Sequence, residues 1–523
     1  MKNPATYKGI YAMHKYWSKK PPTSVASFIQ RFSQEGDIVL DPFSGYGVTG
    51  IEAVRLNRKA VLVDLNPVAT FLSTVIVTPV PIQKIEKTFD DLKRKVTPVL
   101  DSLYHTQCPV CSNKNAIATH YIHEHDTIRT VWVQCPQCKT RRGEKPPSEE
   151  DLCTKSYEDI PFWYPRMTLF ENSRINSKKT MDTRNFFTAR NLYALSFLYS
   201  KIEKIENPLV RNFFTFVMTA SIPQMSNMVF VVKTRGKTAS SERYSKREEV
   251  GSWVVGYWIP DEHFEINVWK CFHTRYRKAL RGKREAATIL SDVRIGSSFA
   301  DLKNVPLFIK TADATNLCFI PDKSIDYIFT DPPHGDRIPY FELSILWASW
   351  LKMDVDFEKE IVVSNAIERE KDITDYRKRL VSAFEEIYRV LKDGKCISVA
   401  FNNLDDETWL SFVDILACSG FEIRDICPMH YSAGSVVQDT RKGGLKSDFI
   451  FTCRKGQPHY VDHDSFVDKK DIQEYVCAAK NSKKHDKGIY EVLNVVVPEL
   501  IREGKFFKIS DILEACKELM ASK

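Results

Sequence analysis

An acidic residue, two prolines and a histidine follow directly after an apolar run at residues 330–340, which read TDPPHGDRIPY. The preceding segment SIDYIF is typical of a buried strand. That strand must end here, because two consecutive prolines lack N–H donors and have fixed φ angles. In open α/β sheets, ligands bind at the carboxyl ends of the strands. The pattern therefore predicts a rigid, solvent-facing corner that presents Asp331 and His334 to a ligand.

A glycine-rich turn near the N-terminus predicts a second part of the same site. Gly45 and Gly47 lie between an apolar strand and a helix in VLDPFSGYGVTGIEA (39–53), where glycines permit positive φ and a close approach of the backbone to a ligand. The next apolar strand ends in Asp64, the place of the acidic residue that binds ribose hydroxyls in Rossmann-type units. A plain glycine turn with a carboxylate at a helix start is the alternative interpretation.

Four of the thirteen cysteines form the pairs CPVC (108–111) and CPQC (135–138). This spacing predicts a closed, structural four-thiolate zinc site on Cys108, Cys111, Cys135 and Cys138. We expect His120, His123 and His125, in the intervening hairpin, to be polar surface residues rather than ligands. The ribbon either contacts nucleic acid or only rigidifies the insertion, and the sequence favours neither.

The bulk composition is that of a globular protein with two to four domains in 523 residues. The net charge of +8, from 75 basic and 67 acidic residues, is compatible with a nucleic-acid partner but does not require one. The N-terminus has no apolar signal region, and no run of about 18 apolar residues occurs, so we expect neither secretion nor a membrane span. Nine singly scattered cysteines favour the reducing cytoplasm.

The order of elements predicts an α/β sheet interrupted by a long insertion. We expect α/β structure over 1–100 and 291–457, a zinc ribbon over 101–150, a helical and basic region over 151–290, and a small helical appendage over 458–523. The second α/β part contains expected helices over 374–392, where Gly394 would be the helix stop, and over 407–419. The segment RIPYFELSILWASWL predicts a helix with a core face.

The region between residues 233 and 284 is rich in Lys, Arg and aromatic residues. Its segment VVKTRGKTASSERYSKREE, which includes Tyr244, is polar and basic enough for a loop that binds a phosphate backbone. For Trp253, Trp258 and Trp269 we favour core positions over base stacking. Near the C-terminus, Lys442 and Lys446 are further candidates for phosphate contacts.

Taken together, these motifs resemble those of S-adenosylmethionine-dependent DNA amino-methyltransferases that modify adenine N6 or cytosine N4. Motif I of the family resembles DPFSGYGVTG together with DLNP, and motif IV (D-P-P-Y or S-P-P-Y in the family) resembles TDPPH. Motif X looks like MHKYWSKKPP (13–22), and the place of motif III is matched by TADATNL (311–317). The order X, I, insertion, IV is similar to the group that carries target recognition between motifs I and IV. The segments PFWYPRMTL (161–169) and GYWIPDEHFEINVW (256–269) look like stretches of that insertion.

The resemblance implies a Rossmann-like class I methyltransferase sheet, with region 151–290 selecting the target. It implies that S-adenosylmethionine is bound by His14, Lys15, Tyr16, Trp17, Asp41, Pro42, Phe43, Gly45, Gly47, Thr49, Asp64, Asn66, Asp313 and Ala314. It also implies a catalytic group made of Asp331, Pro332, Pro333 and His334.

The chemistry at this corner follows from the weakness of an exocyclic amine as a nucleophile, because its lone pair is delocalised into the base. The Asp331 carboxylate and the Pro332 carbonyl would accept its two hydrogens and aim the lone pair at the sulfonium methyl group. His334 stands where the family has an aromatic residue that stacks on a base flipped out of the duplex. Its ring is smaller and titratable, and Tyr340 and Phe341 are candidates for the missing aromatic surface.

The function that we expect is methylation of DNA, at adenine N6 rather than cytosine N4, because motif IV begins with Asp. A restriction-modification or phage-defence setting, with a partner subunit, fits this class. No proline precedes any of the thirteen cysteines, which argues against cytosine-C5 chemistry. One alternative is a tRNA guanine-N2 methyltransferase, because TDPPHGDR also resembles the catalytic corner of that class. A second is an inactive cofactor- or nucleic-acid-binding module.

Overall fold

The computed structural model describes residues 7–152, 155–233, 248–253, 256–291, 293–403, 405–430, 447–458, 466–481, 489–503 and 505–521. The predicted basic loop at 234–247 with Tyr244, and the predicted phosphate contacts Lys442 and Lys446, lie outside these residues.

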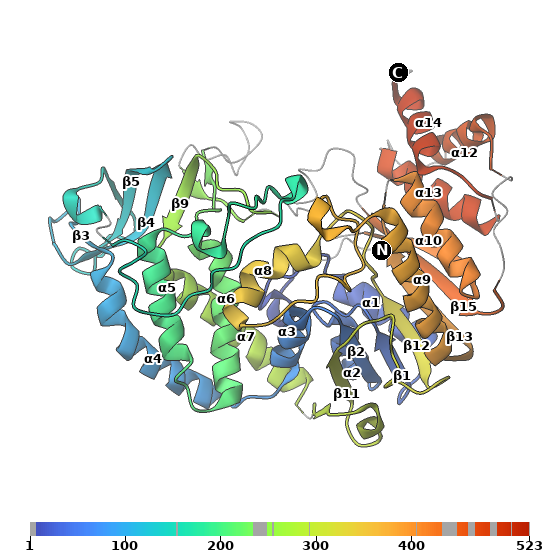
Figure 1. The fold of residues 1–523 in the computed structure, drawn as a ribbon, viewed down its shortest axis with the longest axis horizontal. Coiled ribbons are helices and arrows are strands. Elements are labelled where there is room, and N and C mark those ends of the chain that lie inside the picture. The colour runs from blue at the N-terminus through green and yellow to red at the C-terminus, as the bar shows by residue number, and fades with distance from the viewer. Residues whose placement is uncertain are drawn as a thin grey trace.

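An eight-stranded sheet forms the centre of one half of the molecule (Figure 1). Its spatial order is β10 (Ile295–Gly296), β11 (Leu307–Thr311), β2 (Lys59–Asp64), β1 (Ile38–Asp41), β12 (Ile325–Thr330), β13 (Leu391–Phe401), β15 (Ser447–Lys455) and β14 (Phe421–His430). Neighbours are parallel from β10 to β13, and β15 runs antiparallel to both β13 and β14. The strand order reverses between β1 and β12, and such a switch point opens a ligand crevice at the carboxyl ends of the strands.

Alternate residues of the central strands build two separate cores, as expected for a parallel sheet covered on both faces. One core contains Val39 and Phe329 and packs against α1 (Pro22–Phe32), α2 (Val48–Arg55), α3 (Pro67–Val77) and α8 (Tyr340–Leu351). The other contains Leu40 and Ile328 and packs against α9 (Ile373–Val390) and α10 (Asp406–Cys418). The expected core face of α8 is confirmed, because Leu343, Trp347 and Trp350 are buried.

The predicted insertion separates β2 from β11 and forms the other half of the molecule (Figure 1). Its helices are α4 (Ile82–Ser102), α5 (Ala189–Ile202), α6 (Pro208–Met225) and α7 (Val268–Ile289). Its sheet contains β3 (His105–Thr106), β4 (Ala116–Glu124), β5 (Thr127–Gln134), β6 (Gly143–Lys145) and β9 (Glu262–Ile266). β9 pairs antiparallel with β4, with His120 opposite Ile266, so two distant segments of the insertion close one sheet.

The remaining elements are short or peripheral. The C-terminal appendage is helical, as predicted, with α12 (Lys469–Asn481), α13 (Ile489–Arg502) and α14 (Ile509–Ala521), and it packs into the second core. A two-stranded ribbon joins β7 (Val231–Val232) to β8 (Glu249–Val250). The 3-10 turns are η1 (Gly9–Ala12), η2 (Glu149–Asp151), η3 (Ser173–Ile175), η4 (Thr183–Phe186), η5 (Phe299–Lys303) and η6 (Ile367–Arg369).

Three local predictions were wrong. The helix expected over 374–392 ends at Val390, and Gly394, with φ +70°, lies within β13 instead of ending the helix. His120 and His123 are buried between β-strands, because ring stacking and an ion pair to Glu265 accommodate them there. Trp258 is 49% exposed rather than a core residue.

By contrast, Trp253 is buried and Trp269 packs against the core, as expected. Among the described helices, none alone has the length and apolar composition to cross a membrane. Only α3 and α4 taken together meet that criterion, and they are bent by 115°.

Candidate active site

An open pocket with a cavity volume of about 100 Å³ lies at the sheet's switch point. Its wall includes nine of the predicted residues: Tyr16, Trp17, Asp41, Phe43, Gly45, Thr49, Asp64, Asp331 and Pro333. The wall also contains residues outside the predicted set: Lys19, Lys20 and Tyr46, which lie within the quoted motif segments, and Glu360. The cofactor motif and the catalytic motif, almost 300 residues apart in the chain, therefore share one cavity.

The glycine turn is shaped by the end of β2. The Gly45 N–H donates to Oδ2 of Asp64 (2.7 Å) and the Asn66 N–H donates to Oδ1 (2.8 Å). Burial raises the pKa of Asp64 to about 6, although these two hydrogen bonds oppose the rise. Both carboxylate oxygens are thus fixed at the pocket wall, each with a further lone pair available to a hydroxyl group.

The backbone of the turn requires glycine at two positions. Gly45 has φ +49° and Gly47 has φ +81°. A Cβ atom on Gly45 would lie 3.0 Å from Cε1 of Tyr16, and one on Gly47 would lie 2.8 Å from Oγ of Ser73. The turn therefore keeps its shape, and the pocket its width, only without these side chains.

Asp41 locks the turn onto the catalytic strand. Thr49 Oγ1 donates to Asp41 Oδ2 (2.7 Å), and Thr330 Oγ1 donates to Asp41 Oδ1 (2.8 Å). The Phe43 N–H also donates to Oδ1 (3.2 Å). Burial raises the pKa of this carboxyl to about 7. With three hydrogen bonds, Asp41 joins β1, α2 and β12 at the switch point, immediately before Asp331.

The catalytic corner holds Asp331 between a lysine and a histidine. Lys20 Nζ lies 2.8 Å from Asp331 Oδ2 and 2.6 Å from Oδ2 of Asp448 on β15. His334 Nε2 lies 3.0 Å from Asp331 Oδ1, and the same ring nitrogen hydrogen-bonds the Ala400 carbonyl (3.2 Å). Asp331 Oδ1 itself makes no hydrogen bond within the described residues. Besides its contact with His334, this buried carboxylate oxygen keeps lone pairs that can accept a hydrogen bond from a ligand.

The backbone of the corner is tied to its surroundings. Tyr376 donates its hydroxyl to the Pro333 carbonyl (2.7 Å), and Asn403 Nδ2 donates to the His334 carbonyl (3.0 Å). The His334 ring packs edge-on against Phe401 at 5.0 Å and is not part of the pocket wall. Pro332 is buried behind that wall. Tyr340 and Phe341 do line the pocket and supply its aromatic surface near Asp331.

Other predicted cofactor residues lie behind the wall. The ring of His14 is buried against Trp347, and its Nε2 lies 3.2 Å from Thr219 Oγ1 on α6, so burial lowers its pKa to about 3. The Nζ atom of Lys15 lies over the Trp253 ring, 5.9 Å from the ring centroid. Asn66 caps α3 by accepting the Val68 N–H (3.0 Å). Pro42 and Gly47 belong to the turn but are not part of the pocket wall.

Asp313 and Ala314 follow β11, whose Thr311 is opposite Asp64 in the sheet. This register brings both residues to the same edge as the pocket, although neither is part of its wall. The Asp313 Oδ1 atom accepts the Thr315 N–H (2.9 Å).

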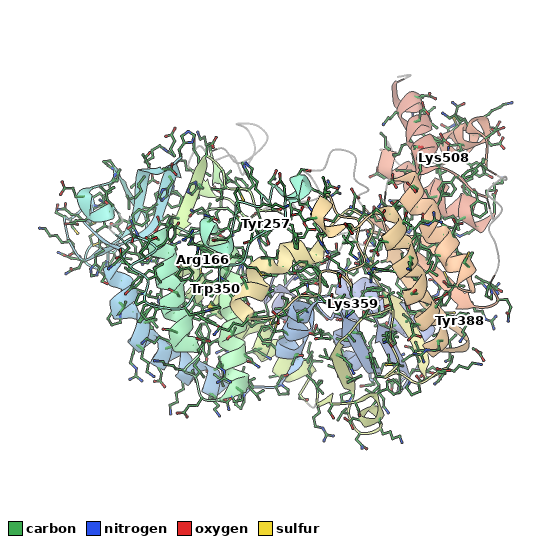
Figure 2. The ribbon with its side chains drawn as sticks, in the orientation of Figure 1. Arg166, Tyr257, Trp350, Lys359, Tyr388 and Lys508 are labelled. Atoms are coloured by element: carbon green, nitrogen blue, oxygen red, sulfur yellow. The ribbon has the colours of Figure 1, made fainter. Side chains whose placement is uncertain are left out.

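Glu360 is a pocket residue for which the sequence held no signal. It accepts the Phe341 N–H (3.0 Å) and a hydrogen bond from Arg369 Nη2 (2.7 Å). Burial raises its pKa to about 7. Arg369 also donates to Glu342 Oε1 (2.7 Å), and Asn172 of the insertion donates to Oε2 of the same residue (2.7 Å). Figure 2 marks Tyr257 at this border, where its hydroxyl donates to the Glu342 carbonyl (2.7 Å).

The four predicted cysteines form one cluster in the insertion. The Sγ atoms of Cys108, Cys111, Cys135 and Cys138 all lie within 4.8 Å of one another, and two of the Sγ pairs are 3.6 Å apart. In tetrahedral zinc thiolate sites, with Zn–S bonds of about 2.3 Å, the sulfurs are separated by about 3.8 Å. The cluster thus fits a closed zinc site without a histidine ligand.

The strand order, the glycine turn and the pocket define a class I methyltransferase fold. The family model described as DNA methylase, of the N6/N4 methyltransferases, matches residues 2–71 and 325–517, which is about half of the chain. The protein belongs to this DNA methylase family, and its family-like parts are split by the insertion. The Type II methyltransferase M.MjaII of Methanocaldococcus jannaschii is 30% identical over 88 residues. The matched segment spans only 17% of each protein.

Solved structures that match part of this chain include a SAM-dependent methyltransferase of Methanosarcina mazei. That protein is 15% identical over 29% of this chain and 69% of its own, with a TM-score of 0.16. TrmN of Thermus thermophilus is 16% identical over 35% of this chain and 34% of its own, also with a TM-score of 0.16.

Proposed function

We propose that this protein transfers a methyl group from S-adenosylmethionine to the exocyclic amine of a base in DNA, with adenine N6 as the acceptor. The observation that carries this proposal is the position of Asp331 Oδ1, which is buried, without a hydrogen bond in the described structure, and in the same pocket as the glycine turn. The family membership gives the chemistry its class. The Asp that begins motif IV, by its resemblance to the family's pattern, supports adenine rather than cytosine.

The residues of the pocket fit the cofactor. The glycine turn leaves space beside Asp64, because Gly45 carries no Cβ that would contact Tyr16. The Asp64 carboxylate would bind the ribose hydroxyls in this space. Tyr16 and Trp17 would pack against the methionine part, and Asp313 lies at the edge where the adenine is expected. When bound, S-adenosylmethionine supplies an electrophilic methyl group on a sulfonium.

Asp331 and the Pro332 carbonyl would act on the amine by accepting its two hydrogens. This draws the lone pair out of the ring and orients it, so the contribution is positioning and electrostatic stabilisation rather than prior deprotonation. Lys20 holds Oδ2 of Asp331, and the amine would use a lone pair of Oδ1, which has His334 Nε2 as a neighbour at 3.0 Å. Tyr340 and Phe341 would contact the face of a base that has left the duplex stack.

The setting that we propose is restriction-modification or phage defence, with region 151–290 selecting the target and a partner subunit as a further component. The similarity to a protein named as a Type II methyltransferase supports this setting. The cysteine cluster would hold a structural zinc ion, because all four ligand positions are filled by thiolates.

The decisive experiment measures transfer of labelled methyl from S-adenosylmethionine to duplex DNA, single-stranded DNA and bulk tRNA, followed by digestion to nucleosides. We expect N6-methyladenine from DNA, and a loss of about 100-fold or more in Asp331→Ala. Asp336→Asn is the matched control, because this acid is on the same corner but outside the pocket wall. Methylguanine from tRNA would instead assign the protein to the RNA enzymes, and N4-methylcytosine would correct the base.

A further inference from the structure

A short loop stands directly beside the catalytic corner. Its neck is closed by a hydrogen bond from the Ser364 N–H to the Lys371 carbonyl (2.9 Å), and its tip is the 3-10 turn η6. Just before the neck, the Val363 N–H donates to the carbonyl of Gly335 in the corner (3.2 Å), and Ile361 lines the pocket. The loop is therefore attached to the site where the amine is proposed to react.

The interior of the loop is unusually well fixed. Arg369 is 2% exposed and donates to Glu342 and Glu360 (both 2.7 Å) and to the Phe357 carbonyl (2.8 Å). Its guanidinium also lies over the Phe170 ring at 5.6 Å. Buried ion pairs of this kind contribute little net stability but strongly oppose any other arrangement of the chain. The tip is thus presented in one conformation.

The residue at this tip is apolar and almost fully exposed. Ile367 is 89% exposed, the highest value among the exposed large hydrophobic residues of the described chain. Scattered exposed apolar residues are common on protein surfaces. Ile367 differs because a buried arginine two residues later anchors it, and because its loop is bonded to the catalytic corner.

Two basic residues of the insertion lie near the loop tip and the corner. Lys179 of the insertion lies 3.7 Å from Glu368, next to Ile367, and Arg174 pairs with Asp336 on the corner. Both cations come from the insertion, and each pairs with an acidic residue of the corner or of the loop tip.

We propose that Ile367 is a wedge that enters the base stack of duplex DNA and fills the space that the target base vacates. This inference rests on the proposed function, because only an enzyme that extracts its base needs such a group. Apolar side chains inserted between base steps are a general means of holding a duplex open. The required partner is therefore paired DNA, not single-stranded DNA.

The test compares Ile367→Gly and Ile367→Ala with the wild type and with Leu209→Ala, an exposed apolar control on α6. The methylated site is first mapped by sequencing of the methylated product. Three probes then carry this site: a paired duplex, the same duplex with an abasic position opposite the target base, and the single strand. We expect Ile367→Gly to slow single-turnover transfer about 10- to 100-fold on the paired duplex only, because the energy of unstacking is no longer offset.

Transfer to the abasic duplex and to the single strand should stay within about threefold of the wild type, since these targets are already unpaired. Equal slowing on all three probes, or no slowing on the paired duplex, would overturn the wedge while leaving the proposed function intact. Failure of the wild type to methylate any DNA would instead overturn both. Unchanged cofactor affinity and melting temperature in Ile367→Ala confirm that the variants are folded.

Discussion

Lys20 and Asp331 form a buried ion pair, with 2.8 Å between Nζ and Oδ2, and Asp448 binds the same ammonium group at 2.6 Å. Three segments meet at this point: the N-terminal segment, the catalytic corner and β15. Lys20 is 5% exposed and Asp448 is fully buried. The lysine therefore pairs with two carboxylates inside the protein, balancing one of their two negative charges, and it holds Oδ2 of Asp331.

Replacing Lys20 by Met should lower the methyl-transfer rate constant about 100-fold, because the Asp331 carboxylate loses its fixed orientation. It should also lower the free energy of unfolding by about 3–5 kcal/mol, since one partner of a buried pair has been removed. Single-turnover kinetics and denaturant titration measure the two effects. Lys20→Met combined with Asp448→Asn should regain part of the stability but not the rate.

Lys323→Met serves as the matched control, because Lys323 forms an exposed pair with Asp393. Recovery of the rate in the double variant would show that Lys20 acts on folding alone.

The affinity for S-adenosylmethionine should fall as the pH drops through about 6, where Asp64 takes up a proton. Because the folded pKa of Asp64 lies above its ordinary value, its ionisation costs stability as pH rises between about 4 and 6. A ligand that binds the ionised form recovers that cost, so affinity should change by up to about tenfold per pH unit below 6.

Calorimetry of the wild type and of Asp64→Asn isolates this contribution, because Asp41 and Glu360, with pKa values of about 7, titrate in both proteins. Parallel pH profiles for the two proteins would exclude Asp64 as the titrating group.

Gly45→Ala should weaken cofactor binding about tenfold, because its Cβ would be 3.0 Å from the Tyr16 ring and push that ring into the pocket. Gly36→Ala is the control for backbone strain alone. Gly36 also has positive φ (+84°), but no atom lies within 4 Å of the position that a Cβ would take there. Binding titrations should separate the two variants, whereas equal affinities would mean that the Tyr16 contact has no role.

The purified protein should contain one zinc ion per chain, and Cys108→Ser should lose it. Removal of zinc by a chelator should lower the melting temperature, because the site joins the two ends of the β4–β5 hairpin. Cys318→Ser, at an exposed cysteine, should keep the metal and the melting temperature. Full zinc content in Cys108→Ser would disprove the four-thiolate site.

The parts of the site that depend only on neighbouring residues in the chain could be predicted from the sequence. The glycine turn, the Asp-Pro-Pro corner and the paired cysteines each depend on local backbone geometry or ligand spacing, so short motifs predict them. The contact of Lys20 with Asp331 and Asp448 depends instead on how three distant segments meet, and no local pattern encodes it. Glu360 was missed for the same reason.

Two of the three hairpin histidines were misjudged because residue type alone does not give burial; His125 is exposed, as expected. His123 is polar, yet its pairing with Glu265 (3.0 Å) and its stacking on His263 offset the cost of a buried position. Both partners are some 140 residues away, beyond the reach of a periodicity argument.

The pairing of β9 with β4 has a consequence for how the insertion can be exchanged between relatives. The first and last thirds of the insertion are strands of one sheet, and His14, next to the cofactor segment, contacts α6 of the same insertion. A recombination breakpoint inside this region would split hydrogen-bonded strands between two parents. Exchange of the insertion between relatives, in nature or in the laboratory, should therefore give a folded protein only when the whole segment from β3 to β9 is transferred together.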